Sequence, residues 1–255
     1  MSGEQADWNA IWQRETIDAA SLLAEEHTLR WKQIERFVHR RWGSFEGLRV
    51  IEIGSGHGTN AIHFARRGAE ATVLDTSEYA LRGAVQSAEA VSTSVLPVVG
   101  DVFDPPSDLL TRFDIACSFG LCEHFLRERR QQVVAAHLSF LDTGGAAVIG
   151  VPNRRSFPYR AWMSFLKLRG HWPLGTEEPF DANELAHRLR EASGRILHVG
   201  YGSFAGTLVG FSINPFLHNA GRKGFKRPQL QTPLDRLAYE LLVIADRPDG
   251  RQLIS

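Results

Sequence analysis

Val50-Ile-Glu-Ile-Gly-Ser-Gly-His-Gly58 decides the fold of this chain. Its first residues form a short apolar run typical of a buried strand, and three glycines follow at every second position. A helical pattern over residues 59–67 comes directly after the loop. Glycine permits tight turns and close approach of the backbone to a ligand. The stretch therefore predicts a nucleotide-binding loop at the carboxyl end of a parallel strand, where ligands bind in open α/β sheets.

Outside this loop, predicted strands alternate with predicted helices, which indicates crossover units and a parallel sheet. We expect an α/β fold: a Rossmann-like sheet of seven mostly parallel strands, the last antiparallel, with helices on both faces. Gly144-Gly145 is expected to break the chain before the fifth strand. The expected strands are 49–53, 71–74, 95–99, 113–119, 146–151, 196–199 and 239–245, and the expected helices are 8–12, 21–41, 59–67, 77–90, 128–141 and 181–192, with Ser77 and Asp181 as N-caps.

The 255 residues suit one large α/β domain, and we expect a single domain over residues 1–255. Three segments fall outside the alternation of strands and helices. Residues 1–46 predict an N-terminal helical lid. Residues 153–180 and 202–235 predict two insertions that cap the open cleft.

The bulk composition argues against several classes of protein. No apolar run approaches the ~20 residues that cross a bilayer, and the N-terminus lacks a signal-peptide pattern. Two cysteines, Cys117 and Cys122, give no disulfide framework, so we expect a cytoplasmic location. The net charge is zero, yet residues 153–176 and 202–234 contain Arg and Lys but no Asp or Glu.

The glycine spacing and one carboxylate distinguish between two kinds of cofactor. The dinucleotide fingerprint is G-x-G-x-x-G, but here the third glycine comes one residue early and Thr59 stands at the last position. Glu52 precedes the loop, where a carboxylate would repel a diphosphate and attract an ammonium or sulfonium group. S-adenosylmethionine carries both cations. The E-x-G-x-G-x-G spacing resembles the first motif of the class I S-adenosylmethionine-dependent methyltransferases.

This resemblance, strongest over residues 48–200 and the final strand, implies roles for residues at the strand ends. Asp75 would take the ribose hydroxyls, Asp101 the adenine amino group, and Phe119 would line the pocket. From the residues alone, Asp75 and Asp101 could instead cap a helix or turn, and Phe119 could belong to the core. The full predicted cofactor set is Trp12, Glu52, Gly54, Ser55, Gly56, Gly58, Asp75, Thr76, Asp101, Val102 and Phe119.

Glu123 and His124 follow the fourth strand and are the predicted catalytic residues. His124 is a candidate general base, and the alternative is that the pair orients the following helix. The stretches at 141–153 and 177–196 resemble small-molecule methyltransferases, including the quinone-biosynthesis type, where an E-x-x-E-H run is associated with a divalent cation. Gly120 replaces the first Glu of that run here, so no metal is expected.

The two insertions combine aromatic residues with basic ones. We expect them to bind a small-molecule acceptor with a lipophilic body and an anionic group, through Arg154, Arg155, Tyr159 and Trp162. Arg160, Lys223 and Arg227 are further candidate anion contacts. The alternatives are a helix lying on a membrane surface, a dimer interface and a solvated basic face.

Other functions are less favoured by the sequence. An RNA or protein methyltransferase is possible because of the basic insertions, but no stacking motif or nucleic-acid module is present, so no nucleic-acid partner is expected. A non-catalytic S-adenosylmethionine-binding scaffold also fits the intact loop. A nicotinamide oxidoreductase is disfavoured by the glycine spacing and Glu52. We therefore expect a methyltransferase that converts S-adenosylmethionine into S-adenosylhomocysteine.

Overall fold

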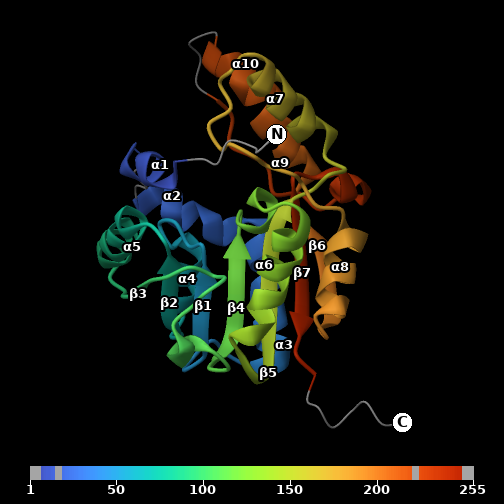
Figure 1. Ribbon diagram of the computed structural model, residues 1–255. Coiled ribbons are helices and arrows are strands. Elements are labelled where there is room, and N and C mark those ends of the chain that lie inside the picture. Colours follow the sequence, from blue (N-terminus) through green and yellow to red (C-terminus); the bar gives the residue numbers. More distant parts are fainter. Residues whose placement is uncertain (1–6, 15–18, 220–223, 249–255) are drawn as a thin grey trace.

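The computed structural model describes residues 7–14, 19–219 and 224–248. A seven-stranded sheet runs through it in the order β3-β2-β1-β4-β5-β7-β6. β7 is antiparallel to both of its neighbours and all other pairs are parallel; in Figure 1 the β7 arrow points down and the β4 arrow points up. The predicted fold class is confirmed. The strands are β1 (Arg49–Ile53), β2 (Glu70–Asp75), β3 (Leu96–Val99), β4 (Phe113–Phe119), β5 (Leu141–Pro152), β6 (Arg195–Tyr201) and β7 (Glu240–Asp246).

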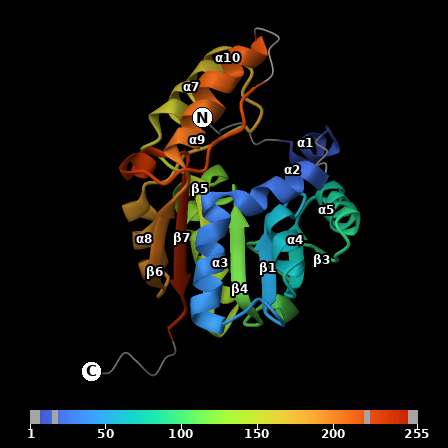
Figure 2. The ribbon, with the colours of Figure 1, turned by 180° about the vertical axis from the view of Figure 1, so that it is seen from behind.

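Helices cover both faces of the sheet. α6 (Arg127–Ser139) and α8 (Ala182–Glu191) pack over one face, seen in front in Figure 1. α3 (Leu29–Trp42) and α4 (Thr59–Ala65) pack over the other, where α3 crosses the sheet in Figure 2. α5 (Glu78–Ala90) packs beside β2 and β3, with Ser77 as its N-cap as expected, and Asp181 caps α8. Because both faces are covered, the central strands are apolar on both sides.

The prediction of one helix over 21–41 is wrong, because the helix is interrupted before Thr28 and a new one begins after it. α2 (Ala19–Ala24) ends before a short 3₁₀ turn, η1 (Glu25–His27), and α3 starts afresh at Leu29. Thr28 is extended, and its hydroxyl accepts from the Trp31 N–H at 3.2 Å. This is an N-cap, which satisfies a backbone donor that a new helix leaves unpaired.

The expected break at Gly144-Gly145 does not interrupt β5. The strand begins already at Leu141, which pairs with Phe113, and the register then shifts so that Ala146 pairs with Ile115. Gly144 has φ +79°, which absorbs the irregularity.

Several short elements gather beyond the carboxyl ends of the parallel strands, at the top of Figure 1. They belong to the N-terminal segment and to the two insertions. They are α1 (Trp8–Arg14), α7 (Phe157–Leu168), α9 (Phe204–Leu208), the π-helical turn Val209–Ile213 and α10 (Asn214–Asn219). The remaining short 3₁₀ turns are η2 (Ser107–Leu109), η3 (Cys122–His124) and η5 (Pro233–Leu237). Among the described residues, no helix has the length and apolarity to cross a membrane.

Candidate active site

The glycine loop is held against the end of β2. The N–H groups of Gly54 and Ser55 donate to the Leu74 carbonyl at 2.8 and 3.2 Å. The Asp75 carboxylate accepts from the Gly56 N–H and the Ser77 N–H, both at 2.9 Å. Asp75 therefore ties the loop to the start of α5. Burial raises the pKa of Asp75, and these backbone N–H groups oppose that shift.

A cavity of about 150 Å³ lies beside this loop, at the carboxyl ends of β1, β2 and β4. Seven predicted residues line it: Trp12, Gly54, Asp75, Thr76, Asp101, Val102 and His124. The other lining residues are Trp8, Ile53, Leu74, Gly100, Phe103, Gly120, Leu121, Phe125 and Arg129.

The α1 helix places two indole rings against the cavity. A Cβ on Gly56 would lie 2.6 Å from the Trp12 ring, so that ring rests directly on the loop. Trp12 also meets the His57 ring edge-on at 5.2 Å, and Trp8 meets the His124 ring edge-on at 4.8 Å. Glycine at position 56 is thus required for close approach as well as for its φ of +52°.

Glu52 does not line the cavity. Its two oxygens accept from the Asn60 side chain at 2.9 Å and the Ala61 N–H at 2.7 Å, at the N-terminus of α4. A carboxylate there satisfies helix donors and favours the helix dipole. Burial raises the pKa of Glu52 to about 7. In the structure Glu52 positions the loop and α4, and its direct contact with a cofactor stays a prediction.

Four other predicted cofactor residues also lie outside the cavity lining: Ser55, Gly56, Gly58 and Phe119. A Cβ added to Gly58 would lie 3.0 Å from the side chains of Val73 and Ala84. Gly58 therefore packs the loop against β2 and α5. Ser55 contributes its backbone. The Phe119 ring lies under the Arg30 guanidinium at 4.8 Å, on the α3 side of the sheet.

The two predicted catalytic residues, Glu123 and His124, lie in different environments. His124 lines the cavity, and its Nδ1 donates to the Thr176 carbonyl at 3.0 Å. Burial lowers its pKa, so the imidazole is neutral at neutral pH. Glu123 is only 2% exposed, and its Oε2 has no hydrogen-bond partner among the described residues. Burial, and then repulsion by Glu177, raises the pKa of Glu123 to about 8.

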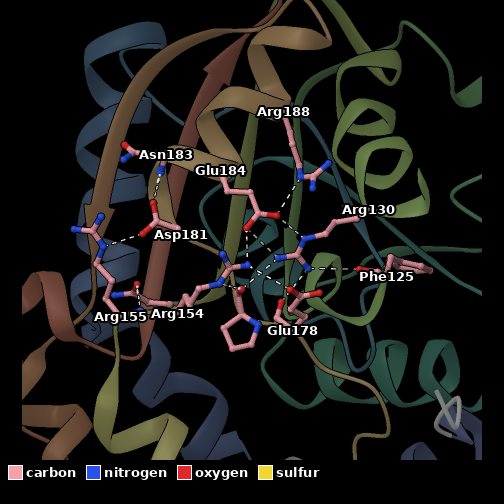
Figure 3. Close-up of polar contacts among 11 residues, drawn as sticks. Phe125, Arg130, Arg154, Arg155, Glu178, Asp181, Asn183, Glu184 and Arg188 are labelled. Carbon is pink, nitrogen blue, oxygen red and sulfur yellow. Dashed lines mark hydrogen bonds and ion pairs between the residues drawn. The ribbon is translucent and has the colours of Figure 1, made fainter. Parts of the chain in front are cut away.

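Arg154 and Arg155 are occupied by carboxylates of this chain. Arg154 bonds to Glu184 at 2.8 Å, and Arg155 bonds to Asp181 at 2.8 Å (Figure 3). Neither lines the cavity. Figure 3 also shows Arg130 bonded to Glu184, at 2.7 Å, so these contacts fasten α8 to its surroundings. The structure thus assigns both arginines to ion pairs within the protein.

The two aromatic candidates on α7 point in different directions. Trp162 stacks on the exposed Phe165 with centroids 5.8 Å apart. Tyr159 is buried, and its hydroxyl donates to Glu177. Lys223 lies outside the described residues.

An aromatic wall near Asp101 was not predicted. Phe103 and Phe125 meet edge-on at 5.0 Å, and the Arg129 guanidinium lies 4.7 Å from the Phe103 ring. All three line the cavity. The available signal was their position, because Phe103 follows Asp101 by two residues and Phe125 follows His124 directly.

Within the described part of the chain, no three His, Cys, Asp or Glu side chains group so as to hold a metal ion.

The strand order, the glycine loop after β1 and the carboxylate ending β2 define the class I S-adenosylmethionine-dependent methyltransferases. This chain belongs to that class through the family described as a methyltransferase domain, whose sequence profile matches residues 25–203. A search of curated protein sequences finds no significant match.

Solved structures with a similar fold share little sequence with this chain. Magnesium protoporphyrin IX methyltransferase from Synechocystis, with bound SAH, is 15% identical with a TM-score of 0.60, over 94% of this chain and 92% of that one. 1,6-Didemethyltoxoflavin-N1-methyltransferase from Burkholderia thailandensis is 18% identical with a TM-score of 0.56, over 89% and 81%. An N-methyltransferase from Bradyrhizobium japonicum is 13% identical with a TM-score of 0.57, over 95% and 100%.

Proposed function

We propose that this protein binds S-adenosylmethionine in the cavity beside Gly54 and transfers its methyl group to a small molecule. The observation that carries the proposal is Asp75, which lines the cavity and is fixed by the glycine loop. The site suits the cofactor because side chains at positions 54 and 56 would collide with Leu121 and Trp12, and because Asp75 and Asp101 line the same space.

In this proposal Asp75 holds the ribose hydroxyls and Asp101 the adenine amino group. The rings of Trp8 and Trp12 offer electron-rich faces to a cation, and α1, within residues 1–46, acts as the lid. When bound, the cofactor supplies an electrophilic methyl group on a sulfonium. Neutral His124, held through Nδ1, can orient an acceptor or take a proton on Nε2. Positioning of the two reactants supplies much of the rate.

A small-molecule acceptor is supported by the names of the structural neighbours, which include a porphyrin and a toxoflavin methyltransferase. The elements of both insertions lie beyond the strand ends, above the cavity side of the sheet (Figure 1). Because Arg154 and Arg155 pair with Glu184 and Asp181, we do not assign them to an anionic group of the acceptor. The free thiols of both cysteines fit a cytoplasmic location.

Calorimetric titration with S-adenosylmethionine and S-adenosylhomocysteine tests this proposal. We expect micromolar binding by the wild type and its loss in Asp75→Ala. Asp108→Ala is the matched control, because Asp108 is exposed on η2 and does not line the cavity. A folded wild-type protein that binds neither ligand would overturn the proposal.

A further inference from the structure

A second cluster of polar and aromatic side chains lies behind the cavity wall. It contains Glu123 and Glu177, which are 2% and 6% exposed, and the phenols of Tyr159 and Tyr239. The Tyr159 hydroxyl donates to Glu177. The Oε2 atom of Glu123 is buried without a hydrogen-bond partner among the described residues. A buried carboxylate oxygen without a partner is costly, so a ligand group is expected to meet it.

Neither carboxyl group takes part in an ion pair among the described residues, although the charge of Lys167 lowers the pKa of Glu177 from a longer distance. Among the described residues, no Lys, Arg or His nitrogen lies within ion-pair distance of either one. Arg130, whose charge lowers the pKa of Glu123, is bonded to Glu184 and to the carbonyls of Glu178 and Pro179. Burial, and then the carboxyl groups of Glu123 and Glu177, raise the pKa of Tyr239, which places both carboxyl groups close to this phenol.

Aromatic rings pack around the Tyr159 phenol, which donates to Glu177. Tyr159 meets Tyr239 at 4.6 Å and Phe211 at 5.1 Å between ring centroids, and Trp172 lies 6.4 Å from Tyr159. The exposed Lys167 ammonium lies 5.6 Å from the Trp172 ring, so the outer side of this wall already attracts a cation. Carboxylates combined with aromatic faces are the means by which proteins recognise organic ammonium groups.

The cluster adjoins the cavity through η3. Gly120 and His124 line the cavity on either side of Glu123 in the sequence, and a Cβ on Gly120 would lie 3.6 Å from Glu123 Oε1. The segment that carries Glu177 is fixed to the same turn, because Thr176 accepts from His124 and the Glu178 N–H donates to the Glu123 carbonyl at 2.9 Å. A ligand beside Gly120 thus comes within reach of the Glu123 carboxylate.

We propose that Glu123 and Glu177, with Tyr159, Tyr239 and Trp172, form the acceptor's polar subsite, and that this subsite takes an organic ammonium group. The inference rests on the proposed function, since it places the acceptor next to the cofactor cavity. A carboxylate on the acceptor would oppose ionisation of Glu123 and Glu177, whereas an ammonium favours their ionised forms. The acceptor is accordingly an amine or a quaternary ammonium compound with a lipophilic body.

Binding of a cation has a second measurable consequence. In the free protein Glu123 holds a proton at neutral pH, because its pKa is about 8. A bound cation favours the ionised carboxylate, so the proton leaves for solvent. A quaternary ammonium probe has no proton of its own to lose, so any proton released comes from the protein.

The probes are choline, its uncharged carbon isostere with a tert-butyl group in place of trimethylammonium, and the anion tert-butylacetate. Each is titrated calorimetrically, in two buffers of different ionisation enthalpy, into the full chain saturated with S-adenosylhomocysteine. Choline is expected to bind with proton release, and the isostere and the anion at least about tenfold more weakly. Glu123→Gln and Glu177→Gln should each weaken choline binding about tenfold, and Glu123→Gln should abolish the proton release.

Glu178→Gln is the matched control, because Glu178 adjoins Glu177 but is exposed, and it should bind choline as the wild type does. Equal binding of choline and its uncharged isostere, or unchanged binding by both Gln variants, would overturn the inference. If the variants do not fold, the comparison of the three probes on the wild type decides. Absence of S-adenosylhomocysteine binding in the first titration would instead contradict the proposed function.

Discussion

Gly58→Ala tests whether the last glycine of the loop packs the fold or contacts the cofactor. Gly58 has φ +66°, a conformation that costs a residue with a Cβ about 1 kcal/mol. The new methyl would lie 3.0 Å from Ala84 Cβ and Val73 Cγ1, and overpacking of this kind costs about 1–3 kcal/mol. We therefore expect the free energy of unfolding to fall by about 2–4 kcal/mol.

Urea unfolding followed by circular dichroism measures this loss, with Gly144→Ala as the control. Gly144 has φ +79°, but a Cβ there would meet nothing within 4 Å, so only the conformational cost of about 1 kcal/mol applies. Equal losses in the two variants would refute the packing argument. Unchanged stability combined with lost S-adenosylhomocysteine binding would restore a direct cofactor contact at Gly58.

Three further predictions concern the lid, an ion pair and a buried acid. In calorimetry, Trp12→Ala should weaken S-adenosylmethionine binding several-fold more than S-adenosylhomocysteine binding, because only the former carries a sulfonium. Equal losses of affinity for the two ligands would mean that the Trp12 ring only packs against the loop. Arg155→Ala should leave both the unfolding free energy and the acceptor KM unchanged, since the Arg155 side chain in its ion pair with Asp181 is exposed; a tenfold rise in KM would restore an anion site. For Glu123 the folded-state pKa is raised from 4.5 to about 8, so the folded state binds more protons and its stability falls as pH rises through that window. In urea unfolding across this pH range, the free energy of unfolding should fall less steeply with pH for Glu123→Gln than for the wild type. The same pH dependence in both proteins would contradict the buried position of Glu123.

The cofactor half of the site could be predicted because its signals are local. Asp75 and Asp101 follow predicted strands, and the carboxyl ends of parallel strands meet at one edge of a sheet. Gly54 is identified by the same loop pattern. These three residues line one cavity although 47 positions separate the first from the last, 101 minus 54.

Strand parity explains why two predicted cofactor residues, Phe119 and Glu52, do not line the cavity. Phe119 follows Ile115 and Cys117 at even spacing, so it faces α3 with them, and the chain turns to the cavity only at Gly120. Glu52 alternates with Ile51 and Ile53, which pack on the α6 side, so its carboxylate points the other way, toward α4. Because both faces of the sheet are buried, hydrophobicity alone does not tell which face a residue takes.

The acceptor half depends on contacts between distant segments. Glu123 follows β4, Glu177 precedes α8, and Tyr239 precedes β7, so no spacing in the sequence brings them together. The excess of Arg and Lys in the first insertion indicated an anionic partner, but ion pairs with Glu184 and Asp181 consume the charge of Arg154 and Arg155. What remains is a pair of buried carboxyl groups without an ion-pair partner among the described residues, and the proposed ammonium subsite rests on this pair rather than on the composition of the segment.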